Sequence, residues 1–267
     1  GIPLDDVEVV HGDTAAIPFG LGTYGSRSTP VGLTAAYVAG QRVLEKAKRI
    51  AAHLLEAAEA DIVFEGGRFF VRGAPERAVT FQEVALEAYV PRKIPADLEL
   101  GLEASAFFNP TNFVFPFGTH VAVVEVDPET GQVKLLRYVA VDDVGRVINP
   151  MVVDGQVHGG VVHGLGQALW EQVVYDEHGN LLTGTWLDYA MPKAADLPFI
   201  ETDRLVTPSP ANPLGVKGAG ETGTIAATPA VVNAVIDALA PFGVRHIDMP
   251  LTPERVWRAI RAAQTQR

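Results

Sequence analysis

The sequence has no cysteine, no long apolar run and no cluster of basic residues. Without cysteine, the chain cannot form disulfides, thiolate zinc sites or Fe–S clusters of its own. We find no stretch of about 18 consecutive apolar residues, and we therefore expect no membrane span. The formal net charge is −11, with 21 Lys and Arg against 32 Asp and Glu. This balance disfavours nucleic acids and anionic membranes as partners, because both are bound through clustered basic side chains.

The length and the apolar content limit how the chain is organised. Its 267 residues, 48% of them hydrophobic, can bury one large core or two modest ones. The sequence begins at Gly1 with GIPLDDVEVV rather than with Met, and such a start reads like the interior of a protein. We therefore expect a fragment, a processed chain or one piece of a split subunit.

Hydrophobic periodicity and turn signals predict a mixture of helices and strands. In the first part of the chain we expect a strand at 7–10, a helix over 34–58, strands at 61–64 and 68–71 joined by Gly66-Gly67, and a short helix opened by a Thr80/Glu83 capping box. Residues 90–111 are expected to connect the two parts. In the second part we expect paired strands at 120–126 and 132–141 and at 171–175 and 181–187, a helix over 157–169, and helices that start at Thr228-Pro229 and Thr252-Pro253.

A glycine-rich loop near the C-terminal end is the most informative segment. Residues 213–223, PLGVKGAGETG, place Lys217 and Glu221 on a backbone with glycine at 215, 218, 220 and 223. Glycine accepts positive φ and lets the main chain come close to a bound group. A helix start follows, so free N–H groups there could face one anionic ligand. A purely structural loop would have the same spacing, and both interpretations stay open at this point.

Two segments have the spacing G-x-G-x-x-G of dinucleotide-binding loops, at 20, 22 and 25 and at 218, 220 and 223. The complete fingerprint needs a preceding hydrophobic strand, an immediate helix and an acidic residue about 20 positions later. Neither segment completes it, so an NAD-binding dehydrogenase is disfavoured.

Other polar residues allow more than one interpretation. Residues 22–29, GTYGSRST, are rich in hydrogen-bond donors and suit a phosphate, a polar heterocycle or a solvated loop equally. Ser26 lacks the G-x-S-x-G context of a nucleophile. His158 and His163 are five positions apart, which is the wrong separation for two ligands on one helix face, so we assign no metal-binding residue.

Six motifs resemble those of one enzyme family and occur in the same order as in that family. They are GTYGSRST (22–29), VDDVGRVINP (141–150), GQVHGG (155–160), GLGQALWEQVVYD (164–176), GTWLDYAMP (184–192) and PLGVKGAGETGTIAA (213–227). Together they resemble the large subunits of the molybdenum hydroxylases, the xanthine dehydrogenase and aldehyde oxidase family, and most of all the carbon monoxide dehydrogenase branch. The chain is similar to the C-terminal, molybdopterin-binding half of such a subunit.

The resemblance implies roles for individual residues. The catalytic glutamate of the family matches Glu221, whose carboxylate would accept the proton of a water-derived Mo–OH group and so create the nucleophile. The residues that match the binding segments for molybdopterin cytosine dinucleotide, with its molybdenum, are Gly25, Ser26, Arg27, Ser28, Thr29, Asp143, Gln156, Lys217, Gly218, Ala219 and Gly220.

The resemblance also implies a fold and a setting. The fold is α+β, with mixed sheets layered against helices, in two subdomains: residues 1–115 and residues 116–267, which carry the glutamate loop. The implied enzyme is a cytoplasmic oxidoreductase that acts on carbon monoxide, an aldehyde or an N-heterocycle. Its partners are the N-terminal half of the large subunit, a medium subunit with FAD and a small subunit with [2Fe-2S] clusters. The alternative is a cofactor-free scaffold module of a redox complex.

Overall fold

The chain forms two compact units, each with its own hydrophobic core. A computed structural model describes residues 1–17, 19–90, 94 and 97–265. Gly1–Gly22 and Val31–Asn109 make the first unit, and Thr23–Pro30 and Pro110–Arg267 make the second. The donor-rich segment that includes residues 25–29 therefore groups with the glutamate loop. The expected subdomain boundary between 115 and 116 stays a prediction.

The first unit packs two helices against a small antiparallel sheet. Its sheet has the order β1-β2-β3. The elements are α1 (Thr34–Leu54), β1 (Ile62–Glu65), β2 (Arg68–Val71), β3 (Ala74–Thr80) and α2 (Phe81–Tyr89), with short helical turns η1 (Leu4–Asp6) and η3 (Glu59–Asp61). A further turn, η2 (Ser28–Leu33), begins in the second unit and ends in the first. The core is formed by the buried face of α1, which includes Ile50 and Ala51, together with Phe69 of β2 and Val84 of α2.

Most sequence-based expectations for this unit are confirmed. Gly66 and Gly67 both have positive φ, as a tight two-residue hairpin turn requires. Thr80 and Glu83 form the capping box that opens α2. The predicted strand at 7–10 is wrong, because this segment pairs with no other strand in the described part of the chain. The connecting segment 90–111 falls partly outside the described residues, and its described part contains no helix or strand.

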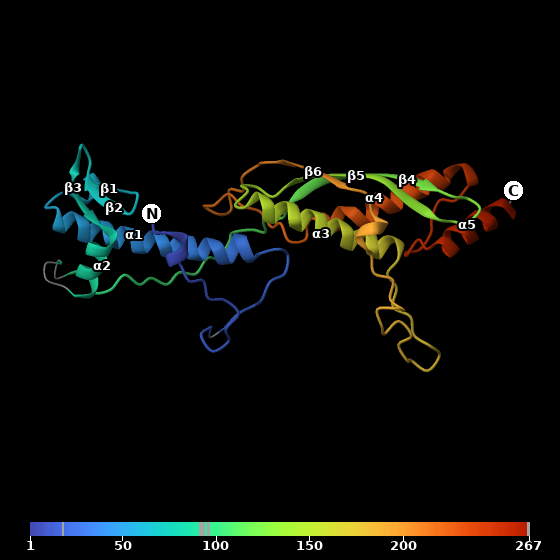
Figure 1. Ribbon diagram of the computed structural model, residues 1–267, viewed down its shortest axis with the longest axis horizontal. Coiled ribbons are helices and arrows are strands. Elements are labelled where there is room, and N and C mark those ends of the chain that lie inside the picture. Colours follow the sequence, from blue (N-terminus) through green and yellow to red (C-terminus); the bar gives the residue numbers. More distant parts are fainter. Residues whose placement is uncertain (18, 91–93, 95–96, 266–267) are drawn as a thin grey trace. The chain divides into compact units, whose positions relative to one another are not determined.

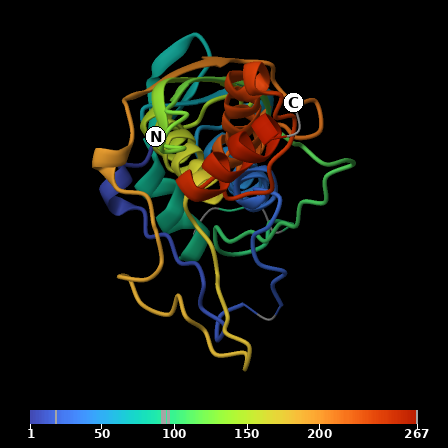
Figure 2. The same cartoon turned by 90° about the vertical axis from the view of Figure 1, so that its right-hand side faces the viewer.

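The second unit is a mixed three-stranded sheet with helices packed on it. Strand β5 pairs antiparallel with β4 and parallel with β6, so the predicted mixed sheet and the α+β class are confirmed. The elements are β4 (Phe117–Val126), β5 (Val133–Asp143), α3 (Pro150–Leu169), η4 (Ala194–Asp196), β6 (Ile200–Leu205), α4 (Thr222–Leu239), η5 (Ala240–Phe242) and α5 (Pro253–Thr265). Helices α3 and α4 lie side by side on one face of this sheet (Figures 1 and 2).

Helices α3 and α4 cross very closely because glycine lies on both sides of the contact. A Cβ atom at Gly160 would come within 2.9 Å of the Cα atom of Gly223, and a Cβ atom at Gly223 would lie 2.4 Å from the carbonyl oxygen of Val157. Real Cβ atoms do not come this close to backbone, so neither position accepts a side chain without a shift of one helix. The beginning of α4 is therefore pressed against the middle of α3.

Two helix starts differ from the expectation. Helix α3 begins at Pro150 rather than near 157, because the Asn149 side chain accepts a hydrogen bond from the Val152 amide and proline is tolerated in the first turn. Helix α4 begins at Thr222, and Pro229 lies inside it, so the predicted start at Thr228-Pro229 is wrong. The predicted start of α5 at Pro253 is confirmed.

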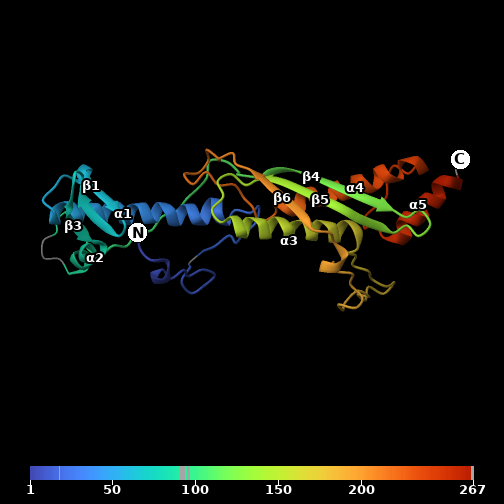
Figure 3. The same ribbon diagram turned by 45° about the horizontal axis from the view of Figure 1, so that its top comes forward.

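Residues 171–192 form an arm that extends away from the helices and the sheet (Figure 3). The two strands expected here reduce to a single bridge between Tyr175 and Leu181. Within the arm, Trp186 and Leu187 are 78% and 98% exposed. The hydrophobic core of the unit draws on residues before and after this arm, and none of its buried members lies within it.

One helical stretch is long and apolar enough to cross a membrane by length and composition, although we expected none from the sequence. It runs from Thr222 to Phe242, over α4 and η5. In the structure its buried side chains, which include Val231 and Val235, belong to the core formed with α3 and the sheet. Of its most apolar window, 22% is buried, and this part contributes to the core of the second unit.

Candidate functional site

The site is built around Glu221, which caps the N-terminal end of α4. The Ser26 hydroxyl donates to Oε2 of Glu221 at 2.7 Å, and the Glu221 amide donates to the same Ser26 Oγ at 2.9 Å. Gly25 and Ser26 have φ of 57° and 55°, in the left-handed region that is uncommon for residues other than glycine. This turn brings the Ser26 hydroxyl to Glu221, across 195 positions of sequence.

Glycine in the 213–223 loop makes this contact possible. A Cβ atom at Gly218 would lie 2.7 Å from the Cβ atom of Ser26 and 3.0 Å from its carbonyl oxygen. From α3, the Gln156 side chain donates to the carbonyl oxygen of Gly220 at 3.3 Å. The close packing explains the glycine at 218, which the sequence left open between a functional and a structural role. The structure thus brings Ser26, Gln156, Gly218, Gly220 and Glu221 together.

Lys217 and Asp143 form a buried ion pair next to this cluster. Lys217 Nζ lies 3.0 Å from Asp143 Oδ1, and the two side chains are 10% and 0% exposed. The Lys217 ammonium also lies 4.2 Å from the ring centroid of Phe117. The Lys217 amide donates to the Val144 carbonyl, which ties the loop to the end of β5. The ion pair thus joins two residues that are 74 positions apart in the sequence.

The environment of Asp143 keeps its carboxylate charged. Burial alone would raise the pKa of Asp143, but the nearby Thr207 hydroxyl, the Gly145 amide and Lys217 outweigh it and hold that pKa below its usual value. Oδ2 of Asp143 is buried and has no hydrogen-bond partner among the described residues. A buried carboxylate oxygen without a donor is uncommon in proteins.

The other residues of the predicted cofactor set lie around this cluster without touching Glu221. Arg27 donates to the Tyr24 hydroxyl at 2.8 Å and covers the Tyr24 ring at 4.6 Å. The Ser28 hydroxyl is bonded to that of Thr23 at 2.6 Å. No hydrogen bond of the Thr29 side chain or of the Ala219 and Gly220 amides is made within the described residues. Free amides in a glycine-rich turn are donors suited to an anion.

A hollow of about 430 Å³ opens beside Glu221, between α3 and the start of α4. Its lining residues are Gln156, Gly159, Gly160, His163, Gly220, Glu221 and Thr224. His163 Nδ1 is bonded to the Thr224 hydroxyl at 3.0 Å. His163 and Thr224 were not predicted as site residues. The sequence spacing could have indicated His163, since it follows Gln156 by seven positions, which is two helical turns and places both residues on the same helix face.

His158 and His163 do not converge on a common point. His158 Nε2 is bonded to the carbonyl oxygen of Ile200, whereas His163 faces Thr224. Among the described residues, no group of three or more His, Asp or Glu side chains could hold a metal ion. The two glycine patterns also lack the surroundings of a dinucleotide fold, because among the residues that the structure describes no strand runs directly into either of them.

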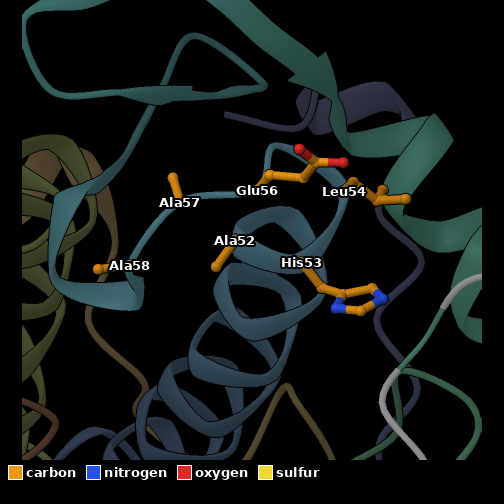
Figure 4. A pocket seen from close by; sticks show the side chains of 6 residues that line it. All are labelled: Ala52, His53, Leu54, Glu56, Ala57 and Ala58. Carbon is orange, nitrogen blue, oxygen red and sulfur yellow. The ribbon is translucent and has the colours of Figure 1, made fainter.

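The first unit has a separate hollow at the end of α1 (Figure 4). Its volume is about 630 Å³, and it is lined by Ala52, His53, Leu54, Glu56, Ala57 and Ala58. The His53 imidazole and the Glu56 carboxylate, its only charged or titratable groups, do not point toward one another in Figure 4. None of the predicted site residues lines this hollow.

Comparison with known proteins identifies the class. Residues 1–198 match the family described as molybdopterin cofactor-binding domain. The chain belongs to this family and is similar to the large subunits of molybdenum hydroxylases. This confirms the family resemblance that the six motifs carried.

Individual relatives come from enzymes with different substrates. The chain is 45% identical over 98% of its length to the carbon monoxide dehydrogenase large chain of Hydrogenophaga pseudoflava, and 42% identical over 97% to the nicotine 6-hydroxylase large subunit of Paenarthrobacter nicotinovorans. It covers 32% of each of them, so it spans about a third of their length. The crystal structure of a Cu,Mo-CO dehydrogenase superposes with a TM-score of 0.91 at 42% identity, over 98% of this chain and 33% of that one.

Proposed function

We propose that this chain forms one wall of the molybdenum cofactor site of a molybdenum hydroxylase and supplies Glu221 as its proton acceptor. The single observation that carries the proposal is the hydrogen-bonded contact of Ser26 with Glu221. The resemblance assigns these two residues to one site from opposite ends of the sequence, and the fold makes them neighbours. When bound, the cofactor supplies the two-electron redox chemistry that the chain itself lacks.

Glu221 is suited to receive a proton. Its Oε2 accepts the Ser26 hydroxyl, while Oε1 has no hydrogen bond within the described residues. Glu221 is exposed and lines the 430 Å³ hollow, and the Ser26 hydrogen bond restrains one of its two carboxylate oxygens. A carboxylate placed in this way could take a proton from a group bound in the hollow.

The surrounding donors suit the anionic part of the cofactor. Lys217 and Arg27 are cations, and the Ala219 and Gly220 amides make no hydrogen bond within the described residues. Together they could bind the phosphates of a molybdopterin cytosine dinucleotide. Gln156 fixes the loop from α3 through the Gly220 carbonyl.

The proposed enzyme contains further chains. The remainder of the large subunit would supply the opposite wall of the site and the residues that choose the substrate, which we take to be carbon monoxide, an aldehyde or an N-heterocycle. This chain has no cysteine and so holds no [2Fe-2S] cluster itself; we assign the clusters to a small partner subunit and FAD to a medium one. A cytoplasmic location is part of the same proposal.

Replacement of Arg27 by Ala tests the cofactor assignment in the assembled enzyme. Arg27 contacts only Tyr24 within the described residues, so its loss should cost little folding stability. A lost charge-assisted contact to a phosphate is worth about 1.5–3 kcal/mol, which predicts roughly tenfold or more weaker cofactor binding. We expect less molybdenum and less released CMP per enzyme, with an unchanged Tm of the cofactor-free protein.

The matched control is Arg137→Ala, which removes an exposed arginine from the middle of β5 where it pairs with Glu201. It should leave molybdenum and CMP at the wild-type level. If Arg27→Ala also leaves both unchanged, Arg27 does not bind the cofactor. Wild-type enzyme with neither molybdenum nor CMP would instead favour the scaffold module without a cofactor.

A further inference from the structure

Four buried polar side chains form a hydrogen-bonded chain behind Glu221, in the interior of the second unit. His120 Nδ1 and the Tyr138 hydroxyl are 2.8 Å apart, and His120 Nε2 lies 3.3 Å from each oxygen of Asp142. Asp142 Oδ1 accepts the Thr222 hydroxyl at 3.0 Å. The His120 side chain is fully buried, and Tyr138, Asp142 and Thr222 are at most 4% exposed. These four side chains connect β4 and β5 to Thr222, the first residue of α4, which directly follows Glu221.

The hydrogen bonds among these four side chains can all run in one direction. Burial, assisted by the charge of Asp142, raises the pKa of the Tyr138 hydroxyl, which stays protonated at neutral pH. It can therefore donate to Nδ1 of His120, and Nε2 of the imidazole then carries a proton toward Asp142. Asp142 then accepts from His120 and from Thr222. Each group has a partner, so the chain can be rigid despite its burial.

The space around this chain leaves it little freedom. A Cβ atom at Gly118 would lie 2.2 Å from Asp142 Oδ1, so the β4 backbone closes directly over the carboxylate. At the next position of α4, Gly223 presses against the backbone of α3. The first turn is thus held by this packing and by the hydrogen bond of the Thr222 hydroxyl.

Pro229 makes these tertiary contacts more important. Proline has no N–H, so the helical hydrogen bond from position 229 to the carbonyl of Ile225 is missing. The start of α4 is tied less firmly to the rest of the helix than a regular start would be. Its orientation therefore depends on the contacts of Thr222 and Gly223.

We infer that Tyr138, His120 and Asp142 act through Thr222 as positioning residues that set the direction of the Glu221 carboxylate. The inference rests on the proposed role of Glu221. We call Tyr138, His120, Asp142 and Thr222 together the brace; these residues touch neither cofactor nor substrate. Rotation of the first turn of α4 would move Glu221 away from Ser26. A misplacement of about 1 Å can lower a rate by about 10²-fold, even where binding is preserved.

Thr222→Val tests the brace, because it keeps the shape of the side chain and removes only the hydroxyl. In the assembled enzyme we expect kcat to fall about tenfold or more, with KM changed less than about twofold and molybdenum content unchanged. Hydrogen exchange should become faster at the amides of residues 222–226. Thr222→Ser, which keeps the hydroxyl, should restore both values.

Two further variants separate positioning from general stability. Thr228→Val removes a hydroxyl from the same helix, where it donates to the Gly164 carbonyl at 3.1 Å, and should leave kcat and exchange at 222–226 unchanged. Equal effects in Thr228→Val and Thr222→Val would overturn the inference, as would wild-type kcat and exchange in Thr222→Val. If Thr222→Val fails to assemble, Tyr138→Phe gives the same test from the far end of the chain, with a smaller expected loss of kcat.

The proposed function and the brace can fail independently. Turnover that survives Glu221→Gln would remove the proposed role of Glu221, whatever Thr222→Val does. Loss of turnover in Glu221→Gln together with no effect of Thr222→Val and Tyr138→Phe would remove only the brace.

Discussion

Replacing Glu221 with Gln is expected to leave the molybdenum content of the assembled enzyme unchanged and to lower turnover about 10²-fold or more. Glutamine has the size of glutamate and can still accept a hydrogen bond from Ser26, so the loop should keep its shape. It cannot take up a proton at neutral pH. The variant therefore removes the proton acceptor and keeps the shape of the loop. Steady-state turnover measures the loss of the proton acceptor, and molybdenum analysis checks that the cofactor site is intact.

Glu201→Gln is the matched control for this substitution. Glu201 is an exposed carboxylate on β6 that pairs with Arg137, and exposed pairs contribute little to stability. The control should turn over like the wild type. Near-normal turnover in Glu221→Gln would show that Glu221 is not the base, even though its loop lies at the site.

Gly223→Ala is expected to destabilise the second unit by about 1–3 kcal/mol or more, because the added methyl group would lie 2.4 Å from the Val157 carbonyl oxygen. Both sides of this contact are helix backbone, which cannot move aside like a flexible side chain. Helices α3 and α4 must separate, and the start of α4 must shift with them. Chemical denaturation should show the loss of stability, and turnover of the assembled enzyme should fall as Glu221 moves.

Gly155→Ala gives the opposite result on the neighbouring helix. Gly155 lies in α3, and a Cβ atom there would have nothing within 4 Å. Alanine should therefore stabilise α3 by up to about 1 kcal/mol through its better helix propensity. If the two alanine variants shift stability in the same direction, the close crossing of α3 and α4 is not what requires glycine at 223.

Local signals in the sequence predicted the elements whose cause is local. The Gly66-Gly67 hairpin and the Thr80/Glu83 capping box depend on residues at most a few positions apart, and both are confirmed. Strand β6 was missed because its alternating residues, IETDRL, gain their partner from β5, about 60 positions earlier. The proline rule misplaced the start of α4, since Pro229 is tolerated inside a helix that tertiary packing holds.

The candidate site shows the same limit. Composition and spacing singled out the 213–223 loop but left open what it does, and the family resemblance named the residues without their contacts. The Ser26–Glu221 and Asp143–Lys217 contacts join residues 195 and 74 positions apart, and no local pattern encodes such a meeting. The sequence did not predict the brace behind Glu221, for a different reason. His120, Tyr138 and Asp142 alternate along strands like ordinary core residues, and only their burial shows that they bond one another.

The exposed arm at 171–192 makes the second unit divisible into two pieces that one core still holds together. β4, β5 and α3 lie before the arm, while β6, α4 and α5 lie after it, and their side chains interleave in a single core. A cut within the arm, between the exposed Trp186 and Leu187, would remove no buried contact of that core. The halves should remain associated after proteolysis and should complement one another when expressed as separate fragments, so the arm is a natural place to insert a tag or a foreign domain.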